Sequence, residues 1–189
     1  MRCGCGRYCT QGQTLSAIWL GVDPGFHGSI AAIHSDGRTE IVGMPVHRDK
    51  KRNTTTKTTI DGPTVRAWLR ALGVANIKMA FIEKAIVMPR QGIVGAGAFV
   101  GGQRFISGIF CGMDIPYREV MPASWKKQLG IQAKVRGAKT GMGVNKELSV
   151  ALAIELYPEA DLSCSNKRYS HDMAEALLLA HLARKESIG

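Results

Sequence analysis

Several carboxylates stand where an apolar element should hold none or should be ending. Asp23 and Glu83 each close a short apolar run, and Asp172 opens the last strongly apolar, helix-forming stretch. Glu175 follows Asp172 by three positions, a spacing that places both side chains on one face of a helix. Carboxylates at such places cost free energy unless a cation is bound beside them. The pattern therefore indicates a cation site built from all four residues.

Four hard oxygen donors without a set of histidine and cysteine ligands favour Mg²⁺ or Mn²⁺. Two such ions about 4 Å apart can activate a water molecule and stabilise the leaving oxygen of a phosphodiester. Taken singly, the residues have simpler interpretations. Asp23 can start a turn, Glu83 can end a strand at the surface, and Asp172 can cap a helix. Their combination favours a phosphoryl-transfer site with two metal ions.

Apolar periodicity and turn signals predict the elements that position these carboxylates. Strands are expected at 17–23, 28–34, 40–45, 77–83 and 117–121, and helices at 61–73, 95–112, 123–129, 145–157 and 170–184. The first three strands should pair antiparallel, and the whole order predicts a mixed α/β sheet with helices on its faces. If the first and fourth strands are parallel neighbours, Asp23 and Glu83 lie side by side, with Asp172 and Glu175 opposite.

The chain of 189 residues fits one domain. Residues 1–16 lack apolar periodicity, so we expect a disordered tail there and a folded domain over 17–189. Cys3, Cys5 and Cys9 of this tail could supply three zinc ligands, but no fourth ligand lies at the usual spacing. The stretch 46–59 is polar and basic and is expected to be a mobile loop.

The charge balance favours a polyanionic partner. Lysine and arginine number 25 against 15 acidic residues, giving a formal net charge of +10. Nucleic acid is the expected partner, and the basic loop with Lys134, Arg136 and Lys139 suits contact with phosphates. The alternative is a solvated basic face. The irregular cysteines and the lack of a run of about 20 apolar residues predict a soluble protein of a reducing compartment, with no membrane partner.

Four motifs, taken in order along the chain, resemble those of the RuvC-type Holliday-junction resolvases, a family of the RNase H-like superfamily. They are Gly21-Val22-Asp23-Pro24-Gly25, Gly28-Ser29-Ile30-Ala31, Phe81-Ile82-Glu83-Lys84 and His171-Asp172-Met173-Ala174-Glu175-Ala176-Leu177-Leu178-Leu179-Ala180. The resemblance implies an RNase H-like fold with a five-stranded mixed sheet flanked by helices. It also implies a homodimer that nicks four-way DNA junctions in symmetric pairs, with Asp23, Glu83, Asp172 and Glu175 as metal ligands.

The resemblance extends to basic and polar residues. Residues 122–128 match a segment in which a backbone-contacting lysine falls on Lys127, and residues 145–147 match a second such segment at Lys146. Both lysines are candidate contacts of the scissile phosphate, and Lys126 joins them as a DNA-binding candidate. The stretch 88–92, with the DNA-binding candidates Arg90 and Gln91, is similar to the phage and organellar branches, and its position after the catalytic strand suggests that it reaches the junction centre. The alternative for it is an ordinary connection between a strand and a helix.

The chain departs from the bacterial members at two positions. Ile86 stands where they place an aromatic wedge three residues after the strand-terminal Glu, and Glu175 stands where they carry Asp. These departures bear on junction opening and on the choice of cleavage sequence. His171 either orients a water molecule or metal ligands, or simply faces solvent at the start of a helix.

Other functions remain open at the level of the sequence. One is an RNase H-fold nuclease that acts on flaps, forks or RNA/DNA hybrids, because the same carboxylates serve many substrates. Another is a non-cleaving junction-binding module, although carboxylates in a DNA groove would repel phosphate unless metal is bound. A sugar-kinase or actin-like ATPase needs two domains, and this chain is too short. The expected setting is a bacterial or phage-infected cytoplasm, or an organelle nucleoid.

Overall fold

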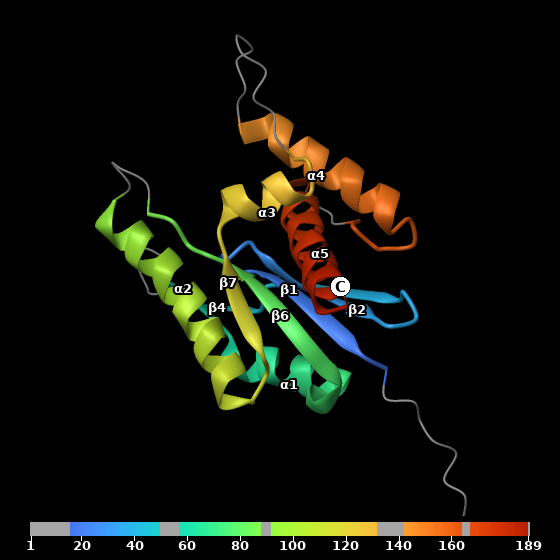
Figure 1. Cartoon of the computed structure of the whole chain (residues 1–189). Coiled ribbons are helices and arrows are strands. Elements are labelled where there is room, and N and C mark those ends of the chain that lie inside the picture. Colours follow the sequence, from blue (N-terminus) through green and yellow to red (C-terminus); the bar gives the residue numbers. More distant parts are fainter. Residues whose placement is uncertain (1–15, 50–56, 88–91, 132–141, 164–166, 189) are drawn as a thin grey trace, which may run out of the picture.

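A computed structural model describes residues 16–49, 57–87, 92–131, 142–163 and 167–188 (Figure 1). Its main sheet has five strands in the order β3-β2-β1-β6-β7. Their bounds are β1 (Ile18–Asp23), β2 (Ser29–His34), β3 (Thr39–Gly43), β6 (Ile77–Glu83) and β7 (Tyr117–Val120). β2 runs antiparallel to β1 and β3, whereas β6 runs parallel to β1 and β7. The expected RNase H-like arrangement, a mixed sheet that begins with three antiparallel strands, is confirmed.

The central strands are buried on both faces, which explains their nearly continuous apolar sequences. One face carries α1 (Gly62–Leu72) and α2 (Ile93–Gly112). The other face carries α5 (Lys167–Ile188), with α3 (Pro122–Gln128) and α4 (Met142–Leu156) beside it. A short 3-10 turn, η1 (Val74–Asn76), joins α1 to β6. Two apolar cores, one on each face, therefore hold the sheet in place (Figure 1).

A glycine in β1 allows α5 to lie directly on the sheet. A Cβ atom at Gly21 would overlap with the backbone oxygen of Ala176 and the backbone nitrogen of Ala180. Any other residue would therefore push the helix away from the strand. Because Asp172 and Glu175 precede this contact on α5, the glycine determines how closely these two carboxylates approach β1.

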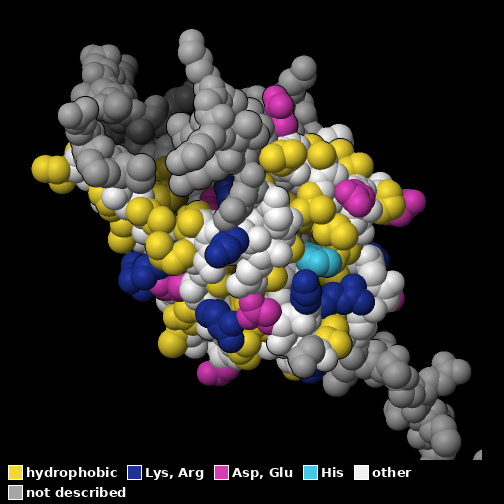
Figure 2. Space-filling model, turned by 45° about the horizontal axis from the view of Figure 1, so that its top comes forward, with side chains coloured by type: hydrophobic (Ala, Val, Ile, Leu, Met, Phe, Trp, Pro, Cys, Tyr) yellow, Lys and Arg dark blue, Asp and Glu magenta, His cyan; other side chains and the backbone are white. Residues whose placement is uncertain are grey.

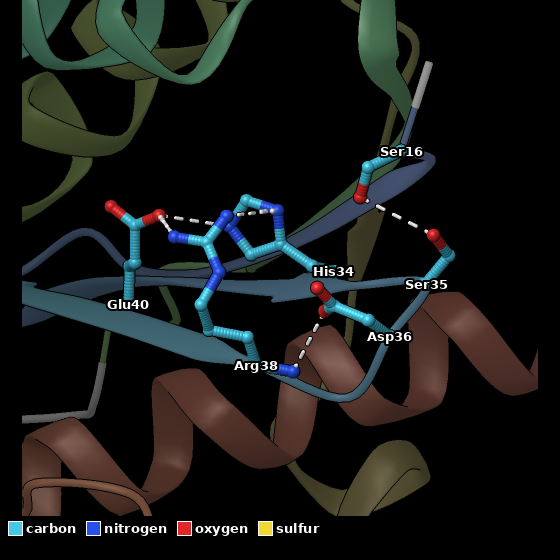
Figure 3. A network of polar contacts seen from close by, with 6 residues as sticks. All are labelled: Ser16, His34, Ser35, Asp36, Arg38 and Glu40. Atoms are coloured by element: carbon cyan, nitrogen blue, oxygen red, sulfur yellow. Dashed lines mark hydrogen bonds and ion pairs between the residues drawn. The ribbon is translucent and has the colours of Figure 1, made fainter. Parts of the chain in front are cut away.

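The hairpin between β2 and β3 is fixed by a polar network (Figure 3). The buried imidazole of His34 contacts Glu40 through Nε2 at 2.9 Å and Arg38 through Nδ1 at 3.2 Å. Arg38 also donates to Glu40 at 2.9 Å. Since a guanidinium only donates, Nδ1 of His34 accepts and Nε2 carries the proton. The network braces the β2–β3 hairpin, and β2 is the strand that pairs with β1.

The stretch 46–59 was expected to be a mobile loop, and for the described residues this expectation is wrong. Its ends are strands β4 (Val46–Asp49) and β5 (Lys57–Ile60), which pair antiparallel as a separate two-stranded sheet. Val46 pairs with Ile60, and both side chains pack into the core beneath α1 and α2. Two apolar anchors and a backbone ladder thus order a segment whose composition is mostly polar. Residues 50–56 lie outside the described residues.

Helix α2 bears on the expectation that no run of about 20 residues is apolar enough to span a membrane. It has 20 residues and, by length and composition alone, is apolar enough to cross a membrane; it is the single helix of this kind in the described part of the chain. One such helix is weak evidence of a membrane span. Gln103, Ile106 and Phe110 of this helix are buried, and Gln103 accepts a hydrogen bond from the backbone of Ala85 at 3.0 Å. Part of α2 therefore packs against the sheet as a layer of the domain.

Candidate active site

Asp23 and Glu83 end neighbouring parallel strands. Val22 of β1 pairs with Ile82 of β6, so the next position on each strand is one of these carboxylates. The turn after β1 is tight: the backbone N–H of Gly25 donates to Asp23 Oδ1 at 3.1 Å. A Cβ atom at Gly28 would overlap with the backbone oxygen of Asp23, so this turn requires glycine there. The predicted side-by-side placement of the two strand-terminal carboxylates is present.

Helix α5 brings Asp172 and Glu175 to the same place. Burial, followed by the charge of Glu83, raises the pKa of Asp23 to about 8, and the charges of Asp172 and Glu175 make smaller contributions to this shift. Asp23 therefore lies close enough to all three other carboxylates to be affected by their charges. These four residues, which the sequence analysis singled out, form one group that we call the carboxylate cluster.

Glu83 and Asp172 of the carboxylate cluster also have raised pKa values. Burial is the main cause that raises the pKa of Glu83, and the charge of Glu175 adds to it. Burial also raises the pKa of Asp172, again with a contribution from Glu175. Lys146 opposes the shift of Asp172, which places the charge of this predicted phosphate contact near the cluster. The cluster holds more negative charge than its surroundings compensate.

Helix α3 supplies two side chains that contact the cluster. Trp125 is fully buried, and its indole N–H donates to Glu83 Oε1 at 3.0 Å. Lys126 donates to Glu175 Oε1 at 2.7 Å, and the hydroxyl of Ser149 on α4 donates to the same oxygen at 3.4 Å. Sequence reasoning assigned Lys126 to DNA binding and missed the roles of Trp125 and Ser149. The available signal was the tryptophan itself, because a buried indole N–H needs an acceptor.

The remaining predicted residues are distributed differently. Lys127 is exposed on α3 and makes no ion pair with the described residues. His171 is half-buried, and its Nδ1 is enclosed without a hydrogen-bond partner among the described atoms, so the ring does not simply face solvent. Ile86 is exposed after β6. Arg90, Gln91, Lys134, Arg136 and Lys139 lie outside the described residues.

The donor set fits a hard divalent cation. Within the described ranges no three His, Cys, Asp or Glu side chains stand as a ready-made metal cage. Lys126 and Trp125 each occupy one carboxylate oxygen of the cluster. Carboxylates that raise one another's pKa and the enclosed, unpartnered Nδ1 of His171 fit a site that takes a cation. Four carboxylates are the ligands that Mg²⁺ or Mn²⁺ prefers.

The chain thus has an RNase H-like α/β fold, with an acidic cluster at the carboxyl ends of its central parallel strands. Among solved structures, the chain is similar to RuvC of Thermus thermophilus, with 14% identity and a TM-score of 0.46 over 89% of this chain and 96% of that one. It is also similar to T. thermophilus RuvC in complex with a Holliday junction substrate, with 13% identity and a TM-score of 0.48 over 89% and 96% of the two chains. No family model and no curated protein matches the sequence. At this degree of similarity, function must be argued from the chain's own residues.

Proposed function

We propose that the chain is a metal-dependent endodeoxyribonuclease that resolves four-way DNA junctions by paired, symmetric nicks. The inference of nuclease activity rests on the carboxylate cluster, in which burial and neighbouring carboxylates raise the pKa of Asp23 to about 8. The junction as substrate rests on the four ordered motifs that resemble RuvC-type resolvases, closest in look to the phage and organellar branches. The cluster alone would equally serve a nuclease for flaps, forks or RNA/DNA hybrids.

The residues divide the work as follows. Asp23, Glu83, Asp172 and Glu175 would hold two Mg²⁺ ions, or Mn²⁺ in their place. When bound, such ions would supply activation of the attacking water and stabilisation of the leaving oxygen of the phosphodiester. The strand ends keep Asp23 and Glu83 at a fixed separation, which pre-organises the site. Lys146, whose charge acts on Asp172, is proposed to contact the scissile phosphate. The exposed Lys127 is proposed to contact the neighbouring DNA backbone.

DNA is proposed to be gripped mainly by connecting segments. All 15 acidic residues but only 16 of the 25 basic residues fall within the described ranges. On the face shown in Figure 2, the described Lys and Arg side chains alternate with Asp and Glu instead of forming one patch. The excess positive charge thus belongs to other segments, chiefly 50–56, 88–91 and 132–141. Arg90, Gln91, Lys134, Arg136 and Lys139 are the proposed DNA contacts there.

A homodimer is proposed because paired nicks in a symmetric junction need two equivalent sites. An apolar surface supports it. At the start of α2, Ile93 is 91% exposed and Val94 is 87% exposed. Ile86 and Val87, at the end of the segment after β6, are also exposed. Exposed large apolar side chains of this kind are candidates for an association surface.

The proposal is tested by a comparison of substrates at equal concentration. Labelled four-way junctions, duplexes, flaps and RNA/DNA hybrids are incubated with the protein and Mg²⁺, and Asp23→Asn serves as the inactive control. We expect junction cleavage to exceed duplex cleavage by at least about 100-fold, and the substitution to abolish it. Preferred cutting of flaps or hybrids would support the proposed nuclease activity but contradict the four-way junction as its substrate. Tight junction binding without metal-dependent cutting would leave a binding module.

A further inference from the structure

Two adjacent residues of α3 connect opposite sides of the carboxylate cluster. The indole N–H of Trp125 donates to Glu83 Oε1 at 3.0 Å, and Lys126 Nζ donates to Glu175 Oε1 at 2.7 Å. The ammonium of Lys126 also lies over the Trp125 ring, 5.0 Å from its centroid. A continuous series of contacts therefore runs from β6 through α3 to α5. We call this series the α3 clip.

The two halves of the α3 clip differ in how firmly they are held. Trp125 is fully buried in the core between the sheet and α5. Its N–H cannot turn to water, so it remains on Glu83. Lys126 ends at the margin of the site: its side chain is 21% exposed, against 10% for Glu175. A flexible ammonium at the margin of a site can leave it for solvent, whereas a buried indole cannot.

The two donors also differ in charge. A neutral N–H takes up one lone pair of one Glu83 oxygen and leaves the rest of the carboxylate for a cation. An ammonium on Glu175 carries the same sign of charge as a metal ion and competes for the same oxygen. A divalent cation and Lys126 therefore cannot both occupy this position at low cost.

We propose that Trp125 is a permanent positioning residue for Glu83, and that Lys126 is an internal counter-ion of Glu175 which a divalent cation displaces. This inference rests on the proposed metal-dependent function. Once displaced, the ammonium of Lys126 stands free at the margin of the site. There it can contact a DNA phosphate, the role that sequence reasoning assigned to it. Metal loading and DNA contact are coupled through this one side chain.

The proposal predicts opposite effects from neighbouring substitutions. Trp125→Phe removes the donor but keeps an aromatic ring, and we expect it to weaken Mg²⁺ binding about tenfold, as is usual when a residue that orients a metal ligand is lost. Lys126→Met keeps the aliphatic stem and removes the competing charge, so it should tighten Mg²⁺ binding several-fold. Both dissociation constants are measured by calorimetry on the full chain without DNA, so that cleavage does not enter the result.

Lys127→Met is the matched control, because it removes the same charge one position away from a side chain that makes no ion pair with the described residues. If the lysines act only by through-space repulsion of Mg²⁺, both lysine variants should tighten Mg²⁺ binding to a similar extent, and the effect should vanish at high salt. Displacement predicts a larger effect for Lys126→Met that persists at high salt. Equal effects, or no change with Trp125→Phe, would overturn the proposal.

Two observations on the unmodified chain keep the test independent of variant folding. On addition of Mg²⁺, the ammonium protons of Lys126, followed in ¹⁵N-edited spectra, should begin to exchange rapidly with water. The indole proton of Trp125 should continue to exchange slowly. An ammonium that stays protected in the Mg²⁺-bound protein would contradict displacement. If neither the unmodified chain nor its variants bind Mg²⁺, the proposed function itself fails, which is a different outcome from metal binding without any response of Lys126.

Discussion

At the scale of single residues, the chemistry is concentrated in Asp23. Burial and the charges of the neighbouring carboxylates raise the pKa of this group from an ordinary 3.8 to about 8. A folded-state pKa above the unfolded value means that the folded protein holds this proton more tightly than the unfolded chain does. Without metal, the contribution of this proton to the free energy of unfolding is fully present below about pH 4 and is lost as the pH rises towards 8.

Asp23→Asn removes this dependence, because an amide does not ionise. We expect the variant without metal to exceed the unmodified chain in free energy of unfolding at pH 8 by at least about 1.4 kcal/mol, the energy of one pKa unit. Urea unfolding between pH 5 and 8 measures it. Addition of Mg²⁺ should reverse the order, since only the unmodified chain gains the full ligand set. Parallel pH profiles for the two proteins would contradict the assigned environment of Asp23.

At the scale of elements, the site depends on the direct contact between β1 and α5. Gly21→Ala would place a Cβ atom against the backbone of Ala176 and Ala180, which cannot move aside as a side chain can. We expect a loss of about 3 kcal/mol in stability, at the upper end for overpacking, together with weaker Mg²⁺ binding because Asp172 and Glu175 are displaced. Urea unfolding and calorimetry measure the two effects.

Gly43→Ala provides the matched control. Gly43 also lies in a strand of the main sheet, but a Cβ atom there meets no atom within 4 Å. This variant should unfold within about 0.5 kcal/mol of the unmodified chain and bind Mg²⁺ equally well. Equal stability of the two alanine variants would show that α5 is not held by the contact at Gly21.

The elements also show what the sequence can and cannot predict. Apolar runs located every strand of the main sheet, and the polar residues that end those runs located Asp23 and Glu83. The two-stranded sheet of β4 and β5 escaped prediction because its order comes from backbone pairing and from two apolar anchors, Val46 and Ile60, in a polar segment. Residue composition carries little information about such pairing.

The α3 clip could not be predicted from the sequence for a different reason. Trp125 looks like any apolar position of a short helix, and the partner of its N–H lies 42 positions away in the sequence. Lys126 looks like part of a basic face, yet its ammonium bonds to Glu175 on α5. Contacts between elements distant in the sequence depend on how the elements pack, and periodicity does not contain that information.

At the scale of the whole molecule, paired nicking requires two copies of the site. If the exposed start of α2 joins the copies, Ile93→Glu with Val94→Glu should shift the protein from dimer to monomer, because each charge would be buried in the interface. Sedimentation equilibrium measures the mass. Ile188→Glu is the control, since Ile188 is also well exposed, at 67%, but lies at the end of α5. A double variant that remains dimeric would place the interface elsewhere.

Paired nicking of a four-way junction is the central claim, and a supercoiled plasmid with an extruded cruciform tests it most directly. A first nick relaxes the plasmid and removes the cruciform, so two nicks across the junction must fall within the lifetime of one complex. With Mg²⁺ we expect linear product carrying symmetric ends, and none with Asp23→Asn. Open circles alone, or equal cutting of a plasmid without the cruciform, would contradict it.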